Sequence, residues 1–109
     1  QAVKNHKFVD PLSFPGVSDL TAHVNFSHII KEVNSLGMNF FGTTTQRDFL
    51  IKLGARERLE ILKKSTNSEK TKIDLEEGLC RLIENSQMGE LFKVCAMSPK
   101  NKLIPEGFD

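Results

Sequence analysis

The sequence predicts a mixed α/β fold, mostly helical, with about four helices and two or three strands, that forms only part of a larger domain. Three observations support this prediction. Apolar residues recur at helical spacing in several segments, and two short apolar runs have the character of strands. A long helical insertion separates these strands, which makes a poor independent sheet, so we expect other sequence to complete it.

The first expected helix covers residues 26–36. The loop before it, residues 8–19, contains two prolines and a glycine, which disfavour a helix, and HKFV at its start is a candidate third strand. Asn25 can cap the helix, and Gly37 can supply the left-handed residue that ends it. The apolar residues at helical spacing are Phe26, Ile29, Ile30, Val33 and Leu36.

A buried strand is expected at residues 38–42, because MNFFG is too short and too apolar for a surface helix and lies between two glycines. A second helix is expected at residues 45–53. Thr45 and Asp48 approximate a capping box at its start, and Gly54 can end it.

Two further helices and a strand complete the expected order. The third helix covers residues 55–64, with leucines inward and charges outward, and the polar run STNS then offers a cap for the fourth and longest helix, residues 69–84. The segment 91–97 alternates in polarity and predicts a strand. We expect residues 99–109, which carry two prolines, to form a loose tail.

The charge and length of the chain exclude several classes of protein. Its 109 residues suit one small, partial domain, and its formal charge of +1 has no long block of one sign. The basic footprint of a nucleic-acid binder is therefore missing. No apolar run approaches the roughly 20 residues that cross a bilayer, so we expect no membrane insertion.

The two cysteines and the first residue carry weaker information. Cys80 and Cys95 form no CxxC pair, so we expect small buried residues in a reducing compartment. The chain begins with Gln1 and its opening, QAVKNHKFVDPL, looks like the middle of a longer protein, so we expect a fragment.

The stretch SDLTAHVNFSH places polar residues that could form a site within eleven positions. His23 and His28 could bind zinc, but a five-residue spacing puts two helical positions on different faces, and no cysteine or carboxylate stands at a familiar interval. Capping, hydrogen bonding or exposure to solvent is the favoured interpretation, and we expect no metal.

The threonine-rich turn GTTTQ precedes an expected helix and could receive an anion at the free N–H groups. The lysine of a phosphate-binding loop is absent, so plain capping by Thr43 to Thr45 is favoured. No nucleophilic triad is visible in the chain. The residues alone therefore indicate no self-contained active site.

Three segments in order carry a resemblance to a known family: QAVKNHKFVDPLSFPGVSDLTAHVNF, GTTTQRDFLIKLGARERLEIL and MGELFKVCAMSP. Together they resemble the C-terminal part of the MidA-like S-adenosylmethionine-dependent methyltransferases, a family that includes the mitochondrial complex I assembly-factor arginine methyltransferase. The resemblance implies a C-terminal fragment of a Rossmann-like methyltransferase fold with helical insertions.

The resemblance also implies where the cofactor binds. The family's glycine-rich S-adenosylmethionine loop and its acidic ribose ligand lie upstream of this segment and do not occur in it. We therefore expect S-adenosylmethionine to bind the full-length protein and not this chain alone, which should be inactive without the upstream half.

The site residues follow from the match at DLTAHVNF, which lies toward the substrate side in the family. Asp19 and His23 are the catalytic candidates, since a carboxylate can hold an arginine guanidinium and an imidazole can accept a proton. Thr21 is a substrate-binding candidate. In the alternative interpretation, Asp19 and Thr21 only fix the loop and His23 bonds to backbone. Weaker substrate-binding candidates are Thr45, Gln46 and Glu90.

The expected function is the substrate-side portion of a protein arginine methyltransferase, with a protein substrate that the resemblance suggests is a complex I subunit. The expected location is the bacterial cytoplasm, or the mitochondrial matrix in a eukaryote. The alternative is a small, non-catalytic helical module that binds a partner protein.

Overall fold

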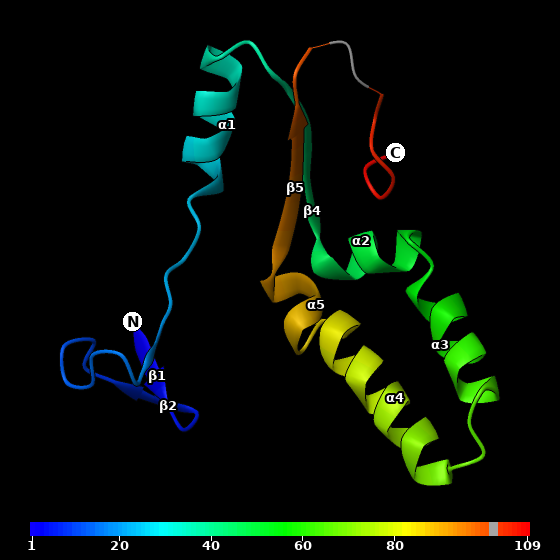
Figure 1. The fold of residues 1–109 in the computed structure, drawn as a ribbon. Helices are drawn as coiled ribbons and strands as arrows, with labels where there is room; N and C mark the ends of the chain where they lie inside the picture. Colours follow the sequence, from blue (N-terminus) through cyan, green and yellow to red (C-terminus); the bar gives the residue numbers. More distant parts are fainter. Residues whose placement is uncertain (101–102) are drawn as a thin grey trace. The chain divides into compact units, whose positions relative to one another are not determined.

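The first two strands of the computed structural model are joined by a tight two-residue turn (Figure 1). Strands β1 (Ala2–Lys4) and β2 (Lys7–Val9) pair antiparallel, and Asn5 and His6 between them both have positive φ, 50° and 61°. This is the backbone of the primed turns that match strand twist. The short strand β3 (Asp19–Leu20) pairs with the other edge of β1, which gives the order β2-β1-β3.

The structure describes residues 1–100 and 103–109, which divide into two units. The first unit covers residues 1–30 and holds the three-stranded sheet; the second covers residues 31–109. Helix α1 (Phe26–Ser35) spans the division. HKFV lies at β2, whereas β1 and β3 were not anticipated.

Three side chains cap helices at positions that the sequence predicted. They are Asn25 before α1, Thr45 before α2 (Gln46–Lys52) and Ser68 before α4 (Glu69–Ile83). Each accepts the backbone N–H of the residue three positions later, at 3.0–3.2 Å. Such caps satisfy N–H groups that the helix itself leaves free.

Strands β4 (Asn39–Thr45) and β5 (Lys93–Ser98) form a two-stranded antiparallel sheet in the second unit. The ladder is interrupted between Phe40 and Thr43, where Gly42 has φ of +105°. A glycine bulge of this kind bends and twists a strand. As a result β4 continues three residues beyond the expected strand, to the cap of α2.

The expected strand at 91–97 begins later, because its first residue belongs to a helical turn. Helix α5 (Met88–Leu91) precedes β5, which starts at Lys93. Gly89 in α5 is buried so tightly that a Cβ there would overlap the carbonyl group of Ile83. Only glycine permits this approach, and the alternation of the sequence does not show the turn between α4 and α5 that brings Gly89 against Ile83.

Helices α3 (Ala55–Lys64) and α4 form a hairpin joined by residues 65–68, and α2 packs against α4 and α5 (Figure 1). Figure 1 shows α3 and α4 side by side across this connection. None of the helices described is long and apolar enough to cross a membrane.

The end of the chain, predicted as a loose tail, makes contacts with α2 at residues 107–109. The rings of Phe108 and Phe49 lie 5.7 Å apart, and Gly107 is packed against the same Phe49 ring. Lys52 Nζ donates to the carbonyl oxygen of Asp109 at 2.6 Å. These contacts could not be predicted from the sequence, since they join positions more than fifty residues apart.

The mixed α/β fold class is confirmed, but the buried core is small. Among the described residues, the buried hydrophobic side chains are Ala2, Val33 and Ile83, while large apolar residues stay exposed in both units. Val17, for example, is 67% exposed and Leu36 72%. Apolar surface on this scale is typical of a segment that packs against further protein.

Candidate functional site

The first group of candidate residues lies along the strand β3 and its continuation. Asp19 pairs with Val3 of β1, and the pairing continues to Thr21, whose N–H donates to the carbonyl oxygen of Gln1 at 2.8 Å. The amino group of Gln1 donates in turn to the carbonyl oxygen of Thr21 at 3.1 Å. Because side chains alternate along a strand, Asp19 and Thr21 point to one face of the sheet, and both are exposed.

His23 follows in an extended segment without helix or strand, and its side chain is exposed. His28, also exposed, lies within α1. Among residues 1–100 and 103–109, no group of three or more histidines, cysteines and carboxylates could hold a metal ion. The structure therefore offers His23 as a solvent-facing imidazole, and its catalytic role stays a prediction.

The second group, Thr45, Gln46 and Glu90, belongs to the other unit. The hydroxyl of Thr45 caps α2, and the side-chain amide of Gln46 donates to the carbonyl oxygen of Leu82 at 2.9 Å. The Gln46 N–H donates to the carbonyl oxygen of Phe92 at 2.9 Å, which joins the start of α2 to the end of α5. Glu90 is exposed. Two of the three side chains thus already have structural partners, and their role in substrate binding stays a prediction.

Arg47 was missed by sequence reasoning, although it belongs to the same cluster. Its Nη1 donates to the carbonyl oxygen of Ile83 at 2.9 Å, beside the bond that Gln46 makes to the preceding residue. The two side chains thus cap the C-terminal end of α4. Its position in the sequence was a signal that it has a partner. A cation in the first turn of a helix is disfavoured by the helix dipole, so its side chain is expected to bind a group elsewhere.

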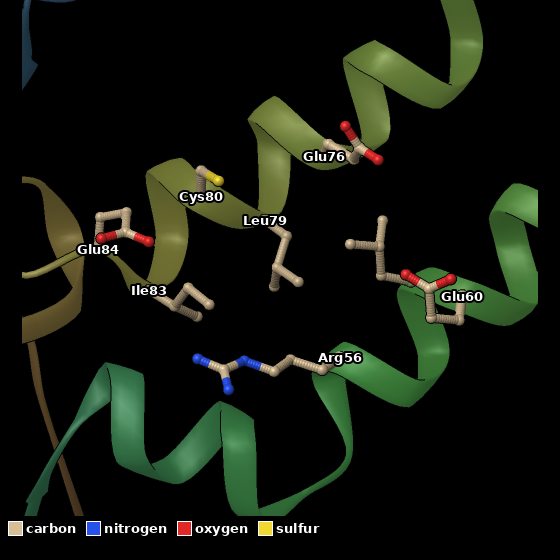
Figure 2. Close-up of a pocket in the computed structure, with 8 residues that line it drawn as sticks. Arg56, Glu60, Glu76, Leu79, Cys80, Ile83 and Glu84 are labelled. Carbon is tan, nitrogen blue, oxygen red and sulfur yellow. The ribbon is translucent and has the colours of Figure 1, made fainter. Parts of the chain in front are cut away.

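A groove of about 380 Å³ lies between α3 and α4 (Figure 2). Its floor is apolar, three glutamates stand around it, and Figure 2 shows the Arg56 side chain extending toward Ile83. The lining residues are Arg56, Leu59, Glu60, Glu76, Leu79, Cys80, Ile83 and Glu84. Cys80, expected to be buried, is exposed here, whereas Cys95 is half-buried.

An ion-pair network joins the two helices beside this groove. Lys63 of α3 donates to the carboxylate of Glu76 of α4, and its Nζ also lies 3.8 Å from Glu60 Oε1. The hydrogen bond to Glu76 is the main cause that raises the pKa of Lys63 above its ordinary 10.5. The network ties α3 to α4 and leaves two of the three glutamates of the groove partly neutralised.

Comparisons with known proteins agree on one family. A family model described as "Putative S-adenosyl-L-methionine-dependent methyltransferase" matches residues 1–44. The chain is 38% identical over 100 residues to the protein arginine methyltransferase NDUFAF7 homolog, mitochondrial, of Caenorhabditis elegans. It is 32% identical over 99 residues to protein arginine methyltransferase NDUFAF7, mitochondrial, of Homo sapiens.

A crystal structure agrees as well. The chain is similar, with a TM-score of 0.78 and 32% identity, to a Burkholderia thailandensis protein described as a "likely methyl transferase" and bound to S-adenosyl-homocysteine. The match covers 99% of this chain and 26% of that protein. The chain belongs to this methyltransferase family. Its fold is that of a fragment of the family's fold, as the sequence predicted.

The chain is short beside its relatives. The matches cover 92% of the chain but 23% of the C. elegans relative, and 91% of the chain but 22% of the human one. The segment therefore corresponds to less than a quarter of either relative.

The described residues of the chain do not fit a site for the family's cofactor. A dinucleotide-type site needs a glycine-rich turn between a strand and a helix, with free N–H groups at the helix start. At the β4–α2 junction the cap is Thr45, Asp48 adds a negative charge to the first turn, and Gly42 lies inside the strand. The groove between α3 and α4 has no glycine turn either.

Proposed function

We propose that the chain is the C-terminal, substrate-side part of an S-adenosylmethionine-dependent protein arginine methyltransferase. The observation that carries the proposal is the similarity along nine-tenths of the chain to relatives named as protein arginine methyltransferases. The related structure bound to S-adenosyl-homocysteine supports the use of this cofactor. In this proposal the complete protein binds the cofactor through sequence outside the chain, and the cofactor supplies the methyl group.

The chain's own contribution is the surface that receives the substrate and part of the surrounding fold. The exposed apolar side chains of both units support this division, because they are the kind of surface that further protein covers. The two-stranded β4–β5 sheet supports it too, since such a small sheet is marginal alone.

Three residues are proposed to act on the arginine. The carboxylate of Asp19 would hold the guanidinium by charged hydrogen bonds, and Thr21, on the same face, would bind beside it. The imidazole of His23 would accept the proton that the guanidinium loses on methylation. The exposure of all three side chains leaves them accessible to a substrate.

The substrate is proposed to be a protein, and the resemblance makes a subunit of respiratory complex I the specific candidate. The relatives are named mitochondrial, which supports a mitochondrial matrix location if the source is eukaryotic; in a bacterium the cytoplasm is the corresponding place.

The experiment incubates the complete protein with radiolabelled S-adenosylmethionine and candidate protein substrates, followed by amino-acid analysis for methylated arginine. We expect label in methylarginine. His23→Gln should lower the rate of methylation without changing cofactor affinity if the imidazole accepts a proton. Label in another residue type, or no label with any protein, would contradict the proposed activity.

A non-catalytic interaction module is the second candidate function. The groove between α3 and α4 favours it, because a cavity of about 380 Å³ with an apolar floor can take a side chain of a partner. Cofactor binding separates the two candidates, since a pure interaction module needs no S-adenosylmethionine. A complete protein that binds no S-adenosyl-homocysteine would favour the module.

A further inference from the structure

The strand register of the first unit aligns three side chains in a row across its sheet. Val3 of β1 stands opposite Phe8 of β2 on one side and opposite Asp19 of β3 on the other. Directly opposite residues of antiparallel strands point to the same face. Phe8, Val3 and Asp19 therefore share one face, together with Thr21, two residues beyond Asp19.

The opposite face is covered in part by the unit itself. Ala2, which points to that face, is fully buried, and Lys4 on the same face places its Nζ 3.8 Å from the centre of the Phe14 ring. The face with the row is open: Phe8 is 75% exposed, Asp19 and Thr21 are exposed too, and Val3 between them is half-buried. On the opposite face, Leu20 beside Ala2 is also exposed. An aromatic ring and a carboxylate thus stand together on an uncovered sheet face.

We propose that this open face binds an extended segment of the substrate protein, in which Asp19 holds the arginine and Phe8 contacts an apolar residue two positions away, on the same face of the segment. The inference rests on the proposed function and adds Phe8 and Val3 to the substrate-binding surface. Phe8 is a specificity-determining residue here, because it selects arginines that have an apolar neighbour.

The spacing and charge of the row fit such a segment. Neighbouring strands lie about 4.8 Å apart, so Phe8 and Asp19 are separated by about 10 Å, with Val3 between them. The methylene stem of an arginine can lie on Val3 while its guanidinium reaches Asp19. Asp19 forms no ion pair within residues 1–100 and 103–109, so its carboxylate has no cation of the described chain to displace.

The test measures binding of a fluorescein-labelled peptide to the complete protein by fluorescence anisotropy. The peptide has a central arginine and a leucine two positions away on each side, so that all three side chains share one face when it is extended. One control peptide has citrulline in place of the arginine, which removes the charge. Another has alanines in place of the leucines, which removes the proposed contacts of Phe8. Binding of S-adenosyl-homocysteine is measured separately for each variant, so that loss of the proposed enzyme function is distinguished from loss of this peptide surface.

We expect the citrulline peptide to bind the unmodified protein about tenfold or more weakly than the arginine peptide. In the Asp19→Asn variant, which lacks the carboxylate, the two peptides should bind with similar affinity. Phe8→Ala should weaken binding of the leucine peptide about tenfold and of the alanine peptide less than about twofold. Phe8→Leu, which preserves an apolar side chain, should lose about threefold. Leu12→Ala is the matched control, since Leu12 is 87% exposed and lies outside the row. This variant should bind both peptides as the unmodified protein does.

Three results would overturn the inference. The arginine peptide could fail to bind while S-adenosyl-homocysteine binds normally. Phe8→Ala could weaken both leucine and alanine peptides equally. Finally, Phe8→Leu could lower the melting temperature without changing peptide binding, which would mean that the rest of the protein, not the substrate, covers the face.

Discussion

The side chains of Gln46 and Arg47 should stabilise the C-terminal end of α4 against local unfolding. They donate to the carbonyl oxygens of Leu82 and Ile83, both at 2.9 Å, and these are among the last carbonyls of α4, which the helix cannot satisfy itself. A neutral hydrogen bond contributes about 1 kcal/mol and one from a charged group about 2 kcal/mol. Since about 1.4 kcal/mol is a factor of ten, Gln46→Ala should speed local opening about fivefold and Arg47→Ala about thirtyfold.

Hydrogen–deuterium exchange of the complete protein, followed by mass spectrometry of the peptides that cover the end of α4 and α5, measures this opening. Arg58→Ala is the matched control, because Arg58 is an exposed cation of α3 that forms no ion pair among the described residues; its exchange should change less than about twofold. Unchanged exchange in both Gln46 and Arg47 variants would refute the capping role. A raised KM for substrate with unchanged exchange in Gln46→Ala would instead return Gln46 to the substrate surface.

Three further predictions follow from single residues. Asp19→Asn should lower catalytic efficiency of the complete protein tenfold to a thousandfold, about 1.5–4 kcal/mol, without changing cofactor affinity; methylation kinetics test this, and full activity would rule out the role in holding arginine. Gly89→Ala should cost about 1–3 kcal/mol by overlap with a carbonyl group of α4, whereas Gly78→Ala, with open space around it, should be neutral or stabilising; equal melting temperatures would contradict this packing. Because the pKa of Lys63 is raised, its bond to Glu76 should stabilise the protein fully below pH 10.5 and be lost as the pH rises through the higher folded pKa. Glu76→Gln should therefore reduce the fall in melting temperature at alkaline pH. An unchanged fall would mean that other groups cause it.

The sequence anticipated features that depend on neighbouring residues. The caps Asn25, Thr45 and Ser68 were predictable because each acts on a residue three positions away. Gly37 likewise follows α1 with a left-handed φ of 66°, as its position after the apolar-periodic residues predicted. Local chemistry was enough for these elements.

Other features were not anticipated, because they lack the usual local marker or depend on packing between elements. The Asn5–His6 turn lacks the glycine that marks most such hairpins, so β1 and its register went unnoticed, and with it the row that includes Asp19. The helical turn around Gly89 depends on packing against α4, and the bond of Gln46 to Leu82 spans thirty-six positions. The candidate residues could be named from the resemblance, but not the surface on which they stand.

Calorimetric titration with S-adenosyl-homocysteine, performed on the complete protein and on the 109-residue chain, tests the central claim most directly. If the chain is the substrate-side part of a methyltransferase, the complete protein binds the ligand and the chain alone gives no binding heat. Binding by the isolated chain with a dissociation constant in the low micromolar range, about −8 kcal/mol, would require a nearly complete pocket within these residues and would contradict the account.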